Sequence, residues 1–336
     1  MRVMITGGTG FVGYHTAQAL MAAGHRVSLL VRSVDKMLQL YGDDCDLDYT
    51  RGDITDVDKV NAALAECDAV IHAAAMVSTK ASDAEKVFNT NIDGARTVIG
   101  GALKIKSVKS IIHVSSVTAL YDPSASILDE NSPPGVARNA YGRSKVACEK
   151  YVRNLKPRGK RVYITYPATV IGPDDPGMTE SHVGMQGYLT AFVPLMPSGN
   201  QYVDVRDVAD AHLRLLEQRP AGGYFTLGGH FLPWAELGRV LEKVTGRHLL
   251  KLPLSGGLMR LTGRVFDRLH PYISVPLPIS EEAMEYATNW VPLDNHKAEK
   301  TLGLSFRPAE ESMADTVRWL CQAGHISSKQ AGVLAG

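Results

Sequence analysis

Two residues in the stretch NAYGRSKVACEK, residues 139–150, have the types and the spacing that proton-transfer chemistry requires. Tyr141 carries a phenol and Lys145 an amine four residues later, so on a helix both side chains lie on one face. An ammonium close to a phenol stabilises the phenolate form and makes the phenol a better proton donor. A lysine on the buried stripe of a helix also needs an acceptor, because burying an unpaired ammonium is costly. The pair therefore predicts a site that binds a ligand and transfers a proton.

The glycine-rich stretch TGGTGFVG, residues 6–13, has the spacing of a dinucleotide-binding turn. It contains Gly8-x-Gly10-x-x-Gly13 and Gly7-x-x-Gly10-x-x-Gly13, follows an apolar strand pattern and opens a helix pattern. Glycines allow a tight turn and let backbone N–H groups approach a pyrophosphate, and the helix N-terminus attracts its negative charge. The predicted nucleotide contacts of this turn are Thr6, Gly7, Gly10, Phe11, Val12 and Gly13.

The end of the second expected strand distinguishes the two nicotinamide dinucleotides. NAD-binding strands usually end on Asp or Glu, which bonds the ribose 2′-hydroxyl. Here the strand reads VSLLVRS, with Arg32 and no acidic residue. A guanidinium can pair with a 2′-phosphate through two hydrogen bonds, and Ser33 and Lys36 are near enough in sequence to assist. We therefore expect NADP rather than NAD, with a solvated surface arginine as the alternative.

Two later strand ends are expected to complete the cofactor site. Asp53 and Ile54 follow the third strand, where they can meet an adenine edge. His72, Ala73 and Ala74 follow the fourth strand, where small side chains let a cofactor lie against the backbone. Ligands of open parallel sheets bind outside the carboxyl ends of the strands, so these residues belong to one predicted crevice.

Strand and helix patterns alternate through the first 170 residues. Such an alternation predicts a parallel sheet with helices on both faces, and unbroken apolar runs are typical of strands buried on both sides. We expect an α/β fold, a Rossmann-type doubly wound parallel sheet with a smaller mixed α/β C-terminal substrate lobe. The expected strands are 2–6, 26–31, 46–51, 69–72, 110–115 and 161–167, and the expected helices are 13–23, 57–65, 91–104 and 140–155.

Beyond Gly172 the alternation breaks, and glycine and proline become denser. This change predicts a second structural unit with a different function. The last ten residues, SSKQAGVLAG, are expected to form a frayed tail. The expected organisation is an NADP-binding Rossmann domain at 1–170 to which 200–218 returns, a substrate-binding lobe at 171–199 and 219–326, and a tail at 327–336.

Composition excludes several functional classes. A net charge of +1 over 336 residues provides no global field for nucleic acid or an acidic membrane. The four cysteines have no Cys-x-x-Cys spacing, so we expect free thiols in a reducing compartment. The 11 histidines show no paired spacing with Cys or carboxylates, so no metal site is expected. With neither a signal peptide nor an apolar run of transmembrane length, the expected location is the cytoplasm.

Seven motifs occur in one order and at suitable spacing. They are TGGTGFVG (6–13), GDITD (52–56), HAAA (72–75), NTNIDGA (89–95), VSS (114–116), YGRSK (141–145) and YPATVIGP (166–173). As a set they resemble the extended short-chain dehydrogenase/reductase family, from residue 1 to about residue 320. The resemblance implies a Rossmann fold, a nicotinamide cofactor and a small-molecule substrate. It also implies a homodimer, paired through helices near 93–105 and 140–155.

The resemblance further implies roles for individual residues. Tyr141 matches the family's proton donor or acceptor, and Lys145 matches the lysine that also bonds the nicotinamide ribose. Ser116 matches the residue that bonds the substrate oxygen, with Ser115 as the alternative because the following segment is one residue longer than expected. Asn91 matches an asparagine that supports a water-linked proton relay in some relatives, or else it bonds a helix terminus. The remaining implied cofactor contacts are Ser115, Pro167 and Val170.

Two branches of the family imply different substrates. Sugar-nucleotide epimerases and dehydratases typically carry Arg and Asn at the positions of Asn200 and Thr169, so this chain lacks two polar contacts that such a substrate would need. The stretches 167–173 and 202–212 instead resemble the dihydroflavonol-reductase-like branch, which acts on mostly apolar molecules. The stretch 254–278, rich in Leu, Met, Phe and Pro, suits a pocket wall, or an amphipathic helix that completes the core of the lobe.

The expected function is that of an NADP-dependent oxidoreductase. It would reduce a ketone or aldehyde, or oxidise the alcohol, of a small to medium and mostly apolar substrate, with Tyr141 as proton donor or acceptor. One alternative is a sugar-nucleotide epimerase or dehydratase of the same fold, in which the cofactor is recycled in place. Another is a non-catalytic NADP-binding regulator, although such relatives commonly lose the Tyr or the Lys and this chain keeps both.

Overall fold

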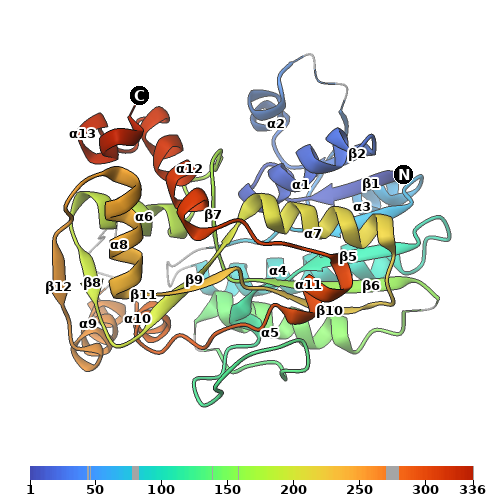
Figure 1. Cartoon of the computed structure of the whole chain (residues 1–336). Coiled ribbons are helices and arrows are strands. Elements are labelled where there is room, and N and C mark those ends of the chain that lie inside the picture. The colour runs from blue at the N-terminus through green and yellow to red at the C-terminus, as the bar shows by residue number, and fades with distance from the viewer. Residues whose placement is uncertain are drawn as a thin grey trace.

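The computed structural model describes residues 1–43, 45, 47–77, 83–137, 139–157, 159–269 and 280–335. Its centre is a seven-stranded sheet with the strand order β10-β6-β5-β4-β1-β2-β3, in which all neighbours pair in parallel (Figure 1). The strands are β1 Arg2–Thr6, β2 Arg26–Val31, β3 Asp48–Arg51, β4 Ala69–His72, β5 Ser110–Val114, β6 Arg161–Pro167 and β10 Gly223–Leu227.

Helices cover both faces of this sheet, as Figure 1 shows with α1 and α7 on one side and α4 and α5 on the other. The expected doubly wound Rossmann fold is therefore confirmed. Successive strand residues point to opposite faces, so Ile111 packs under one helical layer and Ile112 under the other. One layer consists of α3 Val57–Leu64, α4 Ala84–Ala102 and α5 Ala140–Arg153, and the other of α1 Phe11–Ala22, α2 Val34–Tyr41, α7 Val205–Gln218 and α11 His296–Leu302.

A smaller mixed lobe lies beside the sheet, at the left of Figure 1. It holds a three-stranded sheet of order β11-β9-β7 and a two-stranded sheet of β12 and β8. Its own core is centred on Trp234, Leu241 and Met313, all at most 2% exposed. The lobe is built from β7 Thr169–Ile171, β8 Val193–Leu195, β9 Gly199–Asp204, β11 His230–Pro233, β12 Lys251–Pro253, α6 Glu180–Thr190, α8 Trp234–Thr245, α9 Gly256–Leu269, α10 Glu281–Thr288, α12 Ala309–Gln322, α13 Ser328–Ala331 and the short 3-10 turn η3 Gly332–Leu334. A second 3-10 turn, η2 Val117–Ala119, follows β5 and belongs to the large sheet's core.

The boundary between the two parts differs from the expected one at two strands. β10 pairs with β6, with Phe225 opposite Thr165, so residues 223–227 belong to the large sheet and not to the lobe. β9 pairs with β7 and β11, so residues 200–204 belong to a sheet of the lobe, while α7 does return to cover the large sheet. A short apolar strand can pair with either sheet, and nothing local in its sequence decides which.

The C-terminal segment is helical, which corrects the expectation of a frayed tail at 327–336. Ser327 and Gln330 form a capping box, in which the Ser327 hydroxyl accepts from Gln330 N and the Gln330 side chain accepts from Ser327 N at 2.8 Å. Ala331 is fully buried, and Leu334 packs against the core of the lobe. The cap and these apolar contacts hold the segment in place. Gly336 lies outside the described residues.

Three further expectations are refined. Helix α4 begins at Ala84, seven residues before the expected start at Asn91, because Val87 and Phe88 extend its apolar stripe into the core. The stretch 254–278 does contain an amphipathic helix, α9, but its residues 270–278 lie outside the described part of the chain. Among the described residues, no helix is both long and apolar enough to cross a membrane.

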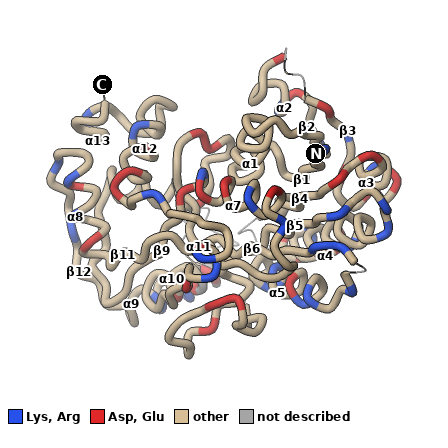
Figure 2. Tube along the Cα trace, turned by 45° about the vertical axis from the view of Figure 1, so that its right-hand side comes forward, with Lys and Arg blue, Asp and Glu red and all other residues tan. Residues whose placement is uncertain are grey.

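Charged residues of both signs are interspersed over the Rossmann part and the lobe, as Figure 2 shows. Several of them join α7 to the C-terminal helices. Asp204 caps α7 by accepting from Arg206 N at 2.9 Å, and Arg206 also pairs with Asp315 of α12 at 2.8 Å. Asp207 accepts from Arg307 N at 2.8 Å. These two aspartates therefore have the capping and loop-ordering roles expected of a helix start.

Candidate functional site

The glycine-rich turn after β1 is closed by its own backbone. Gly10 N donates to Gly7 O at 2.9 Å, and Gly7 has φ of +77°, a conformation that favours glycine. A Cβ on Gly7 would meet backbone atoms of Ala73 and Ala74 at 2.6–2.8 Å, and one on Gly13 would lie 2.2 Å from Gly7 O. The glycines thus bring β1, α1 and the end of β4 together. This is the switch point of the sheet, because β1 lies between β2 and β4.

The open N-terminus of α1 tests whether a dinucleotide fits. Gly10 caps the helix without a side-chain hydrogen bond, and the first turn holds no acidic residue. The hydrogen bond from Tyr14 N to Gly10 O, 2.8 Å long, is the first of the helix, so the amides of Phe11 and Val12 have no partner within it. The Phe11 ring itself is turned inward, 4.9 Å from the His182 ring. These residues fit the pyrophosphate of a nicotinamide dinucleotide.

Arg32 and Asp53 lie at the ends of the neighbouring strands β2 and β3. The Arg32 side chain is exposed directly after β2. The Ser33 hydroxyl is occupied as the cap of α2, where it accepts from Lys36 N at 3.2 Å. Asp53 is half-buried and accepts from N and Oγ1 of Thr55 at 3.0 and 2.8 Å, so its carboxylate orders the turn after β3.

Thr6 and His72, both expected to meet the cofactor, have side chains that are turned into the interior. Thr6 Oγ1 and His72 Nδ1 lie 2.8 Å apart, and Ala74 N donates to Thr6 Oγ1 at 3.3 Å. Burial, with the charge of Lys145, lowers the pKa of His72 to about 3, so its ring is neutral at pH 7. These side chains support the ends of β1 and β4. At both positions only the backbone is therefore left to contact a ligand. Ile54 likewise packs against α4.

Tyr141 and Lys145 lie on α5, which begins with Asn139 accepting from Gly142 N at 2.7 Å. Lys145 is 6% exposed, and its Nζ donates to Val114 O, at the end of β5, at 3.3 Å. The same Nζ lies 5.7 Å from the centre of the half-buried Tyr141 ring. Within the described residues this ammonium has no other hydrogen bond and no carboxylate partner. It therefore has donors left for a ligand beside the phenol.

The two candidate serines after β5 have different surroundings. Ser115 is 5% exposed, and its Oγ donates to Glu149 Oε2 at 3.0 Å. Ser116 is half-buried; its Oγ accepts from Thr118 N at 3.2 Å and lies 3.1 Å from Thr118 Oγ1, to which it donates. Successive residues of a strand end point to opposite sides, which explains the difference. Among the described residues the Ser116 hydroxyl thus bonds only the nearby Thr118, whereas that of Ser115 is held by a buried carboxylate.

Asn91 is 4% exposed within α4, and its side-chain amide is bonded on both sides. Its Oδ1 accepts from Met76 N at 2.7 Å, and its Nδ2 donates to Met76 O at 3.0 Å and to Ser144 Oγ at 2.9 Å. Ser144 Oγ in turn donates to Tyr141 O at 2.7 Å. Asn91 therefore links the segment after β4 to the helix that carries Tyr141. The alternative of a helix-terminus bond is wrong, because α4 begins at Ala84; the relay role stays a prediction.

Pro167 and Val170 lie where the large sheet passes into the lobe. Pro167 ends β6 and is buried, while Val170 in β7 is half-buried and accepts from Ser181 Oγ at 2.6 Å. Sequence reasoning missed the pair that closes the next loop, His182 and Asp175, whose side chains lie 2.9 Å apart. Burial of Asp175 favours its neutral form, but hydrogen bonds from His182 and the loop outweigh that and lower its pKa to about 2.

A buried residue one helical turn beyond Lys145 also escaped the sequence reasoning. Glu149 is fully buried on α5, and the signal that could have revealed it is the spacing of four that joins Tyr141, Lys145, Glu149 and Arg153. In the neighbouring strand β5, His113 is 3% exposed, and neither of its ring nitrogens has a hydrogen-bond partner among the described residues. Burial lowers the pKa of His113 well below its usual value.

A glycine turn beneath an open helix N-terminus, at the switch point of a doubly wound sheet, is how Rossmann enzymes bind nicotinamide dinucleotides, and this chain is an NAD(P)-dependent enzyme of that class. Comparison with known proteins then identifies the family. The chain belongs to the NAD dependent epimerase/dehydratase family, whose model matches residues 3–228. The resemblance to the extended short-chain dehydrogenase/reductases is thereby confirmed.

Relatives of known name include both reductases and epimerases. Cinnamoyl-CoA reductase 1 of Arabidopsis thaliana is 28% identical over 97% of this chain and 90% of its own length. UDP-glucose 4-epimerase of Neisseria meningitidis is 26% identical over 65% of this chain and 74% of its own length. The crystal structure of gox2253 superposes with a TM-score of 0.79 at 27% identity, covering 97% of this chain and 99% of that one. A Synechocystis relative carries dihydroflavonol 4-reductase in its name, which supports that branch.

Proposed function

We propose that the protein is an NADP-dependent oxidoreductase that reduces a ketone or aldehyde, or oxidises the corresponding alcohol, of a small to medium and mostly apolar substrate. The observation that carries this proposal is the environment of the Lys145 ammonium. Its ammonium is 6% exposed, is bonded to one backbone carbonyl and lies beside the Tyr141 phenol. A buried ammonium with unused donors calls for further acceptors, and hydroxyl groups of a bound cofactor would supply them.

The residues have complementary roles in such a reaction. In its reduced form the bound cofactor supplies a hydride to the carbonyl carbon. Tyr141 donates its phenolic proton to the carbonyl oxygen, so hydride and proton together convert the carbonyl into the alcohol. The Lys145 ammonium stabilises the phenolate that remains, and the Ser116 hydroxyl donates a hydrogen bond that orients the oxygen. In the oxidation direction Tyr141 accepts the proton from the alcohol.

Two positions on neighbouring strands of the lobe favour an apolar substrate over a sugar nucleotide. Thr169 of β7 and Asn200 of β9 replace the Asn and Arg that sugar-nucleotide enzymes typically carry. Here they bond each other, Thr169 Oγ1 donating to Asn200 Oδ1 at 2.8 Å, and Gln201 N donates to the same oxygen at 2.8 Å. These positions therefore offer no cation to a diphosphate. The cinnamoyl-CoA reductase relative also aligns over more of the chain than the epimerase does.

Steady-state assays of the purified protein separate the proposed function from its alternatives. Continuous NADPH consumption on addition of aromatic or alicyclic ketones and aldehydes is the expected result. Turnover of UDP-glucose or a related sugar nucleotide without net cofactor consumption would instead establish the epimerase alternative. Tight NADPH binding without turnover of either substrate class, unchanged by Tyr141→Phe, would establish a non-catalytic regulator.

Arg32→Ala is expected to weaken NADPH binding about 10- to 100-fold and to change NADH binding little. The exposed guanidinium after β2 is the group placed to pair with a 2′-phosphate, which NADH lacks. Dissociation constants for both dinucleotides, measured by protein fluorescence or calorimetry, test this. Arg51→Ala provides a matched control, because Arg51 is also exposed and ends the adjacent strand β3. Equal losses for the two cofactors would contradict the preference for NADP.

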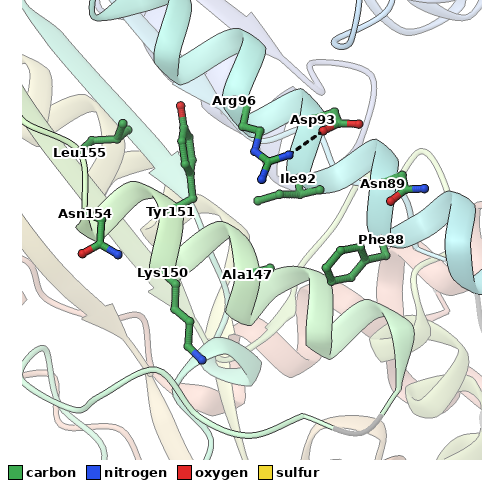
Figure 3. A pocket seen from close by; sticks show the side chains of 10 residues that line it. All are labelled: Phe88, Asn89, Ile92, Asp93, Arg96, Ala147, Lys150, Tyr151, Asn154 and Leu155. Atoms are coloured by element: carbon green, nitrogen blue, oxygen red, sulfur yellow. Dashed lines mark hydrogen bonds and ion pairs between the residues drawn. The ribbon is translucent and has the colours of Figure 1, made fainter.

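We also propose a homodimer that pairs through a groove between α4 and α5. Figure 3 shows side chains of both helices around this groove, which has a volume of about 840 Å³. Its apolar lining is rimmed by charges of both signs, including the ion pair between Asp93 and Arg96 at 3.1 Å. A two-fold axis would place this surface against its own copy, so that Asp93 of one copy could approach Arg96 or Lys150 of the other. The lining residues are Phe88, Asn89, Ile92, Asp93, Arg96, Ala147, Lys150, Tyr151, Asn154 and Leu155.

Ala147→Arg is expected to convert the dimer into a monomer. Ala147 lines the groove, and a long charged side chain at this position would prevent the partner helix from packing closely. Light scattering after gel filtration measures the mass in solution. Ile127→Arg introduces the same charge at an exposed apolar position outside the groove and should leave the mass unchanged. A monomeric wild type, or a dimer in the Ala147→Arg variant, would contradict the proposed surface.

A reducing compartment such as the cytoplasm is the proposed location. All four cysteines are free thiols. Cys67 and Cys148 are buried, and burial raises the pKa of each to about 11, so these thiols are unreactive at neutral pH. Such unpaired thiols are typical of proteins that work under reducing conditions.

A further inference from the structure

A fully buried carboxylate lies between helix α5 and the strands β5 and β6. Glu149 is 0% exposed and accepts three side-chain hydrogen bonds. Ser115 Oγ donates to Oε2 at 3.0 Å, and Tyr166 OH and Arg153 Nε both donate to Oε1 at 2.5 Å. Ser115 directly follows β5, Tyr166 belongs to β6 and Arg153 lies one turn further along α5. One carboxylate thus connects three elements of the Rossmann domain.

Arg153 provides the countercharge and is itself held on several sides. Its guanidinium donates to Tyr166 OH at 2.8 Å and to Ser132 O at 2.9 Å, and lies 4.5 Å from the centre of the Tyr224 ring in β10. A buried ion pair adds little net stability compared with apolar side chains of the same size. A gain in net stability therefore does not explain why this charged pair is buried here. Holding its partners Ser115 and Tyr166 in place does explain it.

The same row of α5 residues holds the end of β5 at two successive positions. Lys145 Nζ donates to Val114 O at 3.3 Å. One helical turn later, Glu149 accepts from the hydroxyl of Ser115 at 3.0 Å. Ser116 is the next residue. The strand end that precedes it is therefore hydrogen-bonded at two positions to α5, the helix that carries Tyr141 and Lys145.

We propose that Glu149 is a positioning residue that, through Ser115, sets the place of Ser116 relative to Tyr141. The inference rests on the proposed function, in which Tyr141 and Ser116 meet the same substrate oxygen. Both hydroxyls must then lie at hydrogen-bond distance from one atom, and a displacement of about 1 Å in such an arrangement costs about 100-fold in rate. Glu149 is enclosed by protein and acts through its neighbour, not on the substrate.

A double-mutant cycle on kcat tests the proposal, with Glu149→Gln, Ser115→Ala and the two combined. Each single variant is expected to lower kcat for ketone reduction about 10- to 100-fold with little change in KM. The combined variant is expected to lose no more than the larger single loss, because both changes remove the charge-assisted hydrogen bond that Ser115 donates to the Glu149 carboxylate. Ser115→Thr keeps the hydroxyl and should restore most of kcat. Ser115→Ala leaves the Glu149–Arg153 pair intact, so folding is retained in at least that variant.

Asp207→Asn is the matched control for a purely structural role. Asp207 is 3% exposed and is paired with Arg307, but it lies on α7, on the opposite side of the sheet from α5. Its substitution is expected to lower Tm and to leave kcat and KM unchanged. Wild-type kcat in both Glu149→Gln and Ser115→Ala, with only Tm lowered as in the control, would overturn the positioning role.

Hydrogen exchange provides a readout that needs no turnover. The backbone amides of residues 114–118 are expected to exchange faster in Glu149→Gln and in Ser115→Ala, while those of β1 stay unchanged. Unchanged exchange at 114–118 would overturn the proposal. Additive kcat losses in the combined variant would also overturn it, since Ser115 would then act directly on the substrate. If the wild type reduces no carbonyl compound, the proposed function fails, and the exchange data alone decide whether Glu149 holds the strand end.

Discussion

Replacing Tyr141 with phenylalanine is expected to lower kcat for carbonyl reduction by about 1,000-fold, within the range found for removal of a general acid. Phenylalanine keeps the ring and removes only the hydroxyl group, which carries the transferable proton. Within the described residues the Tyr141 hydroxyl makes no hydrogen bond, so its loss strands no buried partner. Fold, Tm and cofactor affinity are therefore expected to stay at their wild-type values, and the loss should fall on kcat.

Single-turnover reduction followed at the NADPH absorbance band measures this loss, together with Tm and the dissociation constant of NADPH. Tyr49→Phe removes a hydroxyl from an exposed tyrosine of β3 and serves as the matched control, with wild-type kcat expected. A Tyr141→Phe variant with kcat within a factor of about three of the wild type would rule out the phenol as the proton donor.

Gly13→Ala is expected to impair both folding stability and cofactor binding. An added Cβ would lie 2.2 Å from the carbonyl oxygen of Gly7 and 2.7 Å from its carbonyl carbon. Both are backbone atoms, so the clash is relieved by opening the turn between β1 and α1. We expect the free energy of unfolding to fall by about 3 kcal/mol and NADPH affinity to fall about 100-fold, since the helix amides no longer converge on the pyrophosphate.

Gly10→Ala separates these two effects. A Cβ on Gly10 would meet only Gly7 O, at 3.3 Å, and the residue is exposed at the cap of α1. Its stability is therefore expected to change by less than about 1 kcal/mol, while NADPH binding weakens because the added methyl occupies the approach to the helix amides. Urea unfolding and calorimetric titration of both variants measure the two quantities. Equal unfolding midpoints for Gly13→Ala and the wild type would show that the turn is not closed in this way.

Much of the large sheet could be predicted because its strands are buried on both faces. Residues 2–6, 26–31, 69–72 and 161–167 are the strands that their unbroken apolar runs predict. The expectation that residues 223–227 belong to the lobe is wrong, because strand pairing over a long distance in the chain decides which sheet they join. The run is just as apolar, but its partner strand β6 lies some 60 residues earlier in the chain, and pairing across such a distance leaves no local signal.

The site divides in a similar way. The glycine turn and the Tyr141–Lys145 pair depend on neighbours within eight residues, and the structure brings each group together. The resemblance favours Ser116 and keeps Ser115 as the alternative, because the difference in their surroundings is the contact that Ser115 makes with Glu149, 34 residues away. The sequence pattern predicts Asn91 at a helix start, but its three hydrogen bonds reach Met76 and Ser144 from inside α4.

The sequence by itself determined the class of fold, the glycine-rich turn and the Tyr141–Lys145 pair that is proposed to move a proton. These follow from local physics. Glycine permits the backbone conformation of the turn, the runs of apolar residues predict the strands, and a spacing of four residues places two side chains on one face of a helix. Only the tertiary structure decided which serine bonds the buried Glu149, how Arg153 pairs with that carboxylate, and which sheet β10 joins. Those outcomes depend on how elements distant in sequence approach one another, and burial then determines which polar groups must find partners there.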